Sequence, residues 1–155
     1  MHSTIYEITQ DIIDPDDWAD ESNFYEDDNV GYTTLLTSEE RVEAIEYLYN
    51  AHWFQRLFSR GKERDTIVYN GNIELVKEEW YQNLQKELHE LIDQKQCNTY
   101  KLRRAINRPF AEDILFCLPG WYGSQSCHSI KLLELLNDME SGTVFHINSV
   151  FDYHW

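Results

Sequence analysis

The sequence predicts an α+β fold, a single compact domain over residues 1–155 in which a small mixed β-sheet of about four or five short strands is covered by three or four helices. Three observations predict this class. Stretches with helical periodicity alternate with short runs of strand-forming residues. The strand-like runs are few and short. The chain has 155 residues and contains neither an internal repeat nor an interdomain linker, which is typical of one domain.

Short apolar runs mark the expected strands. Residues 3–9 alternate around Ile5 and Ile8, whereas 114–118 is a continuous apolar run that is typical of a buried strand. The expected strands are residues 3–9, 30–36, 65–69, 114–118 and 143–151.

Apolar residues at helical spacing mark the expected helices. The first has the clearest start, because Thr37 and Glu40 stand at the spacing of a capping box, and Gly61 is a natural stop. Asn72 is the expected cap of a longer helix. Pro109 ends a shorter one, because the residue before a proline avoids the α conformation. The expected helices are residues 38–60, 73 to 93 or 95, 99–107 and 127–139.

The most unusual stretch is the acidic segment, residues 11–28, which contains nine acidic residues and neither Lys nor Arg. Residues 1–46 hold 14 acidic residues against one basic residue, Arg41, and so carry −13 of the chain's formal charge of −15. Such a field attracts basic partners and repels nucleic-acid backbones and anionic membranes. We therefore expect no direct binding to nucleic acid and no binding to a membrane.

Two conformations of the acidic segment are compatible with its sequence. One is an irregular, partly mobile loop that is held open by its own charge. The other is a short helix over residues 15–21, with Asp14 as the N-cap and Pro15 at the first helical position. In the second case Trp18 and Phe24 would pin the segment to the body of the protein.

The function we expect is that of an acidic protein-interaction module that binds a basic partner, in the manner of an inhibitor, an immunity-type protein or a nucleic-acid mimic. Aromatic residues beside acids favour this use, because Trp and Tyr are common interface anchors. A solvated loop that serves solubility is the competing interpretation of the same charge. The expected contact residues are Asp16, Asp17, Trp18, Phe24, Tyr25, Asp27 and Asp28.

A cysteine-dependent hydrolase is the alternative function, although we expect the chain not to be an enzyme. Cys127 lies near the expected start of the last helix, where the helix dipole favours a thiolate. On the returning strand, His154 or Asp152 is better placed than His146 to approach it. No family signature surrounds Cys127, so a structural cysteine near a helix cap is the simpler interpretation. A third hypothesis is a structural subunit or homodimer without catalysis.

The remaining features give weaker expectations. The chain has three cysteines and no CxxC, which argues against a disulfide framework and suits the cytoplasm, as does the lack of a signal-peptide pattern. We expect no cofactor and no metal ion. Trp121 and Tyr122 form either a recognition loop or a turn whose rings cover the core. The basic residues of 101–108 are expected to pair with the acidic segment, within the chain or across a homodimer.

Overall fold

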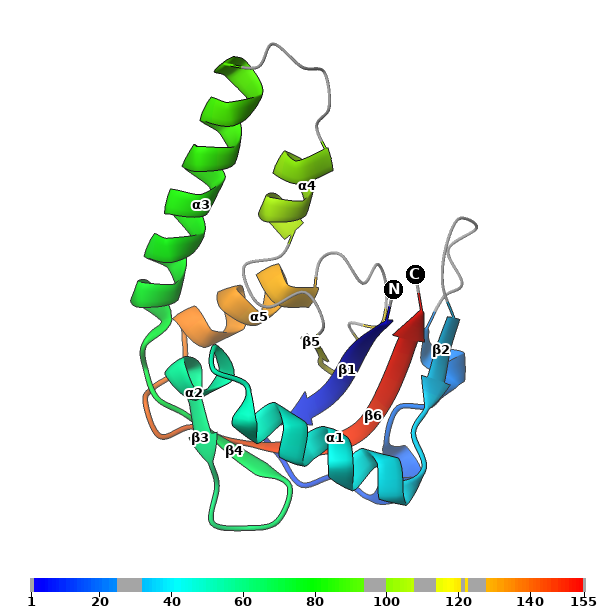
Figure 1. The fold of residues 1–155 in the computed structure, drawn as a ribbon. Helices are drawn as coiled ribbons and strands as arrows, with labels where there is room; N and C mark the ends of the chain where they lie inside the picture. The colour runs from blue at the N-terminus through cyan, green and yellow to red at the C-terminus, as the bar shows by residue number, and fades with distance from the viewer. Residues whose placement is uncertain are drawn as a thin grey trace.

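The structure is a computed structural model that describes residues 2–24, 32–93, 100–107, 114–120, 122 and 128–154. Within these residues the strands are β1 (His2–Thr9), β2 (Tyr32–Leu35), β3 (Phe58–Arg60), β4 (Thr66–Tyr69), β5 (Ile114–Cys117) and β6 (Val144–His154). The α-helices are α1 (Ser38–Asn50), α2 (Phe54–Leu57), α3 (Ile73–Asp93), α4 (Tyr100–Asn107) and α5 (His128–Asn137). The expected α+β class is confirmed (Figure 1).

The sheet is organised around β6, its longest strand. The strand order is β3-β4-β6-β1-β5, and β2 also pairs with β6. β1 runs antiparallel to β6, and β5 runs parallel to β1, so the sheet is mixed. β4 pairs with the start of β6 and β2 pairs with its end, so these two short strands share one edge of β6. The chain termini consequently lie beside each other at one end of the sheet (Figure 1).

One face of the sheet, the helix-covered face, carries the main hydrophobic core. Residues of α1, α2 and α5 and the start of α3 pack there against alternate residues of the strands (Figure 1). The capping box that starts α1 is present, since Thr37 Oγ1 accepts from the Glu40 amide and the Glu40 carboxylate accepts from the Thr37 amide at 3.0 Å. This core fixes the sheet, and the opposite face remains for the acidic segment.

The helix expected over 38–60 is wrong in its second half. α1 ends at Asn50, α2 adds a single turn, and the chain then becomes strand β3. The change places Phe58 among the buried rings of Phe54, Phe116 and Phe145. Pairing of β3 with β4 and burial of Phe58 therefore outweigh the helical periodicity, which is a local signal only.

An arm made of α3 and α4 extends away from the sheet (Figure 1). The first turns of α3 reach the core through Ile73 and Val76, and Trp80 is half-buried against the same core. The indole of Trp80 also donates a hydrogen bond of 2.7 Å to the Ala105 carbonyl of α4. No helix among the described residues has the length and apolar character needed to span a membrane.

Candidate functional site

The described part of the acidic segment, residues 11–24, lies over the face of the sheet opposite to the helices, which we call the segment-covered face. It forms two short 3₁₀ turns, Pro15–Asp17 and Glu21–Asn23, and not the single helix over 15–21 that was one of the two expectations. The expected start is nevertheless confirmed: Asp14 is the N-cap, Pro15 opens the first turn, and the Asp16 amide donates to Asp14 Oδ1 at 3.0 Å.

The buried carboxylate of Glu7, on β1, holds this segment to the sheet. Its side chain is fully buried. Glu7 Oε2 accepts a hydrogen bond of 3.0 Å from the Ala19 amide and one of 3.4 Å from the Ser149 amide. The Ser149 hydroxyl donates in turn to the Ala19 carbonyl at 2.7 Å. Neutral donors alone therefore satisfy Glu7 among the described residues, and they join the acidic segment to β1 and β6.

A β-bulge in β6 makes this arrangement possible. Tyr6 pairs with Val150 and Ile8 pairs with Ile147, so β6 has one residue more than β1 between these two pairs. The bulged residues, Asn148 and Ser149, are polar and buried. A bulge leaves backbone groups without their ladder partners. The freed Ser149 amide is the group that reaches Glu7.

Arg41, the one basic residue of the first 46, is used within the body of the protein. Its guanidinium donates to the carbonyls of Ile147 and Asn148 and forms an ion pair of 2.7 Å with Asp65. The guanidinium carbon also lies 5.1 Å from the ring centre of Trp18, a cation–π contact. Arg41 thus anchors the acidic segment through an aromatic ring and neutralises none of its carboxylates.

The acidic residues in the described part of the segment, residues 11–24, are exposed. None of them forms an ion pair with any described residue. Asp14 and Asp20 cap backbone amides, and Glu21 accepts a hydrogen bond of 2.8 Å from the Leu35 amide at the edge of β2. Hydrogen bonds from the Ser22 hydroxyl and amide hold the pKa of Asp20 below its usual value, which keeps this group charged. The exposed acids of the described part are Asp11, Asp14, Asp16, Asp17, Asp20 and Glu21.

The expected pairing of the basic residues of 101–108 with the acidic segment is not found for Lys101, which makes no ion pair within the described residues. Its helix, α4, packs on α3, away from the segment (Figure 1). The side chains of Arg103, Arg104 and Arg108 lie outside the described part. Within the described part of the chain, therefore, the exposed acids of residues 11–21 form no ion pair with a Lys or Arg side chain.

The expected contact residues divide into three groups. Asp16 and Asp17 are exposed, as a contact surface requires, whereas Tyr25, Asp27 and Asp28 lie outside the described residues. Trp18 is half-buried against Arg41. The expectation that Phe24 contacts a partner is corrected: Phe24 is buried, with its ring centre 4.7 Å from that of Phe151. Trp18 and Phe24 fulfil the other expectation, that they pin the segment to the body.

Tyr122 also helps to hold the acidic segment to the sheet. Its hydroxyl donates to Glu7 Oε1 at 2.9 Å, and its ring meets the ring of Phe24 edge-on. Burial, and then the hydrogen bond and charge of Glu7, raise the pKa of Tyr122 well above its usual value. Of the two expectations for Trp121 and Tyr122, these contacts favour a turn that covers the core. Trp121 lies outside the described residues.

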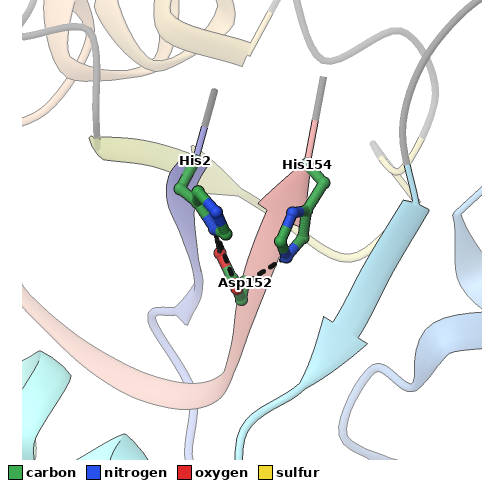
Figure 2. A group of neighbouring side chains, drawn as sticks. All are labelled: His2, Asp152 and His154. Carbon is green, nitrogen blue, oxygen red and sulfur yellow. Dashed lines mark hydrogen bonds and ion pairs between the residues drawn. The ribbon is translucent and has the colours of Figure 1, made fainter.

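The residues of the hydrolase hypothesis are only partly described. Cys127 lies outside the described residues, so its activation stays a prediction. Cys117 is buried, and burial followed by the charge of Glu7 raises the pKa of its thiol well above the usual value, so it is an inert cysteine. Asp152 and His154 lie together at the end of β6, and the structure brings His2 to them (Figure 2). Sequence reasoning missed His2 because His154, the residue opposite to it in the sheet, is 152 positions away in the chain. Only the register of β1 on β6 brings the two together.

Comparison of the chain with protein-family models, with curated proteins and with solved structures finds no match. The functional conclusion therefore depends on the geometry and charge described above.

Proposed function

We propose that the protein is an interaction module that binds a basic protein partner through its acidic segment. One observation carries the proposal: the six exposed acids at positions 11 to 21 form no ion pair among the described residues, because their segment is attached to the sheet through backbone groups, the buried carboxylate of Glu7 and the contact of Arg41 with the ring of Trp18. Their charge is therefore available to a partner. A protein that neutralised these acids with its own cations would present a much weaker field.

The ordered conformation of the segment favours binding over a role in solubility alone. A solvated tail would serve solubility without caps, a buried anchor or stacked rings. Here Asp14 and Asp20 cap their turns, and Glu7 and Arg41 fix Ala19 and Trp18. A surface that is already ordered loses less conformational entropy when it binds, which increases affinity. The negative charges of the segment also increase the rate of association with a cationic surface, and this rate depends on salt.

A protein that normally binds nucleic acid is the class of partner that fits best. Such a protein carries clustered Lys and Arg side chains for phosphate groups. An array of carboxylates on a rigid surface can occupy those side chains and exclude the nucleic acid. The role is then that of an inhibitor or an immunity-type protein.

Charge reversal at two exposed acids tests the proposal. The variant Asp16→Lys with Asp17→Lys changes the segment, and Asp93→Lys with Glu134→Lys is the matched control, because it makes the same change of charge on exposed residues of α3 and α5. Partners are captured from cells that produce the protein, and each is then purified and re-measured with the three proteins. We expect the segment variant alone to lose a basic partner, and the association rate of that partner to fall as salt increases.

The proposal fails if every captured partner binds the segment variant and the wild-type protein equally well. It also fails if the control variant loses the same partners to the same extent, because total charge and not the segment would then govern binding.

A further inference from the structure

Two histidines and one aspartate meet at the end of the sheet where the two termini lie. Asp152 and His154 are two positions apart on β6, so their side chains emerge on the same face. β1 pairs with β6 in a register that places His2 opposite His154. All three side chains therefore project into the same space, as Figure 2 shows. They are at least a quarter exposed, with relative side-chain accessibilities of 68% for His2, 34% for Asp152 and 28% for His154.

The distances between their polar atoms suit a shared ion. His2 Nδ1 lies 3.2 Å from both carboxylate oxygens of Asp152, and His154 Nε2 lies 2.9 Å from Asp152 Oδ2. One ligand atom from each of the three residues lies within 4.8 Å of the others. Ligands of a tetrahedral zinc ion, at bond lengths near 2.1 Å, are about 3.4 Å apart. The two histidine-to-aspartate distances are close to this value, and the ligand atoms of the two histidines lie within 4.8 Å of each other, so side-chain rotations would complete the geometry.

The surroundings hold the ligands in place and favour a cation. The ring of Tyr32, on β2, stacks on the ring of His154 with a centroid distance of 4.5 Å and an interplanar angle of 13°. The carboxylate of Glu40 is close enough to Asp152 for the two to interact electrostatically. The formal charge of −15 raises the local concentration of cations further.

We propose that His2, Asp152 and His154 form a binding site for a divalent transition-metal ion of the zinc class. Two imidazole nitrogens and one carboxylate are a ligand set that such ions take in proteins, with a further position open to water or to a ligand from another molecule. Because two ligands come from β6 and one from β1, the ion joins the two ends of the chain. The site is separate from the acidic segment, so its test and that of the proposed function can fail independently.

The competing explanation is a hydrogen-bonded His–Asp–His trio that binds no ion. Titration of the chain of residues 1–155, without an affinity tag, with zinc chloride in a calorimeter separates the two. The variants Asp152→Asn and His154→Ala each remove a ligand, and Asp152→Asn keeps the shape of the side chain. His52→Ala is the matched control, because His52 is an exposed histidine between α1 and α2 that belongs to no such group.

We expect the wild-type protein and His52→Ala to take up about one zinc ion per chain, and the two ligand variants to bind it about tenfold more weakly or worse. At the same zinc concentration, the midpoint of thermal unfolding should rise more for the first two proteins than for the ligand variants. Uptake of no zinc by the wild-type protein, or equal affinity in all four proteins, overturns the proposal.

Cobalt identifies the type of ligand independently of the variants. Cobalt bound by imidazole and carboxylate gives visible absorption without a thiolate charge-transfer band in the near ultraviolet, and we expect this spectrum. A thiolate band would assign the ion to the cysteines and overturn the proposal.

Discussion

The two faces of the sheet are covered in different ways. Among the described residues, the helix-covered face has a cluster of 20 buried hydrophobic residues, whereas the cluster on the segment-covered face has six. Helices can be held by apolar burial alone, because their backbone groups are satisfied internally. The acidic segment has little regular structure and a small apolar contact, so its attachment requires polar anchors. Glu7, Ser149 and Tyr122 supply them, and the charged side chains are left to face solvent.

The comparison of the two faces shows how the acidic segment can be ordered without ion pairs to its carboxylates. Capped turns, a buried carboxylate that accepts from backbone amides, and an arginine that stacks on a ring together replace ion pairs. The acids are consequently positioned and unpaired in the described part of the chain. This combination is what a binding surface for a basic partner requires.

The largest expected effect is at the centre of the helix-covered face. Phe145 is fully buried, and Phe145→Ala should lower the free energy of unfolding by about 3–5 kcal/mol, because it leaves a cavity among packed rings. On the other face, Phe24→Ala should cost less, about 3 kcal/mol at the lower end of the same range, since Phe24 keeps some exposure and packs in the smaller cluster. Urea unfolding measures both. Equal losses would contradict the view that the two faces differ in how they are held.

The next largest effect is expected at Glu7, which holds the acidic segment by hydrogen bonds. Glu7→Ala leaves the buried amides of Ala19 and Ser149 without their acceptor. We expect the free energy of unfolding to fall by about 2–3 kcal/mol. The fall is limited to this value because the variant also removes the desolvation cost of the buried charge. Glu7→Gln keeps an acceptor and should cost less. In Glu7→Ala, hydrogen exchange of the Ala19 amide should become faster than the loss of global stability explains. Amides of α1 should exchange only as much faster as the lower free energy of unfolding requires. Unchanged exchange at Ala19 would show that Glu7 does not hold the segment.

A smaller effect concerns the pH dependence of the segment-covered face. The pKa of the Cys117 thiol is raised, so the native state keeps this proton while the unfolded state loses it near pH 8.5. The contribution of Cys117 to stability is therefore complete below that pH and decreases as pH rises above it. In a variant with Cys97→Ser and Cys127→Ser, alkylation of Cys117 should follow global unfolding only. Rapid alkylation of the native protein at pH 8 would contradict this environment.

The smallest effect concerns the second turn of the acidic segment. The pKa of Asp20 is lowered by its hydrogen bonds to Ser22, so its contribution to stability is present above its ordinary pKa and is lost as pH falls through the lower native value. Asp20→Ala should therefore shift the urea midpoint slightly at pH 7 and not at all in strong acid. A difference between the two proteins that is constant with pH would show that the charged form of Asp20 makes no contribution.

The sequence predicts the helix-covered face better than the other. Periodicity and caps identify β1, α1, α3 and β5, because these signals arise from neighbours in the chain. The end of α1 was misplaced, because Phe58 gains its burial from residues distant in sequence. Long-range pairing of this kind leaves no local pattern.

The segment-covered face depends on polar contacts that sequence reasoning did not find. A charged residue within an otherwise strand-like run, Glu7 between Tyr6 and Ile8, was the available signal, but its partners Ala19 and Ser149 are set by the bulge in β6. Asp152 and His154 were recognised as candidates for another chemistry. The register that brings His2 beside them could not be derived from composition or spacing.

The central claim is that the acids of the segment are unpaired, and the salt dependence of stability tests it most directly. The free energy of unfolding is measured in low and high salt for the wild-type protein, for Asp16→Lys with Asp17→Lys, and for the control Asp93→Lys with Glu134→Lys. Reversal in the segment should stabilise the protein more than the control at low salt, because it relieves repulsion among like charges, and the advantage should shrink as salt screens them. Destabilisation of the segment variant at low salt would contradict the account, because it would mean that Asp16 and Asp17 are already neutralised by the protein's own cations.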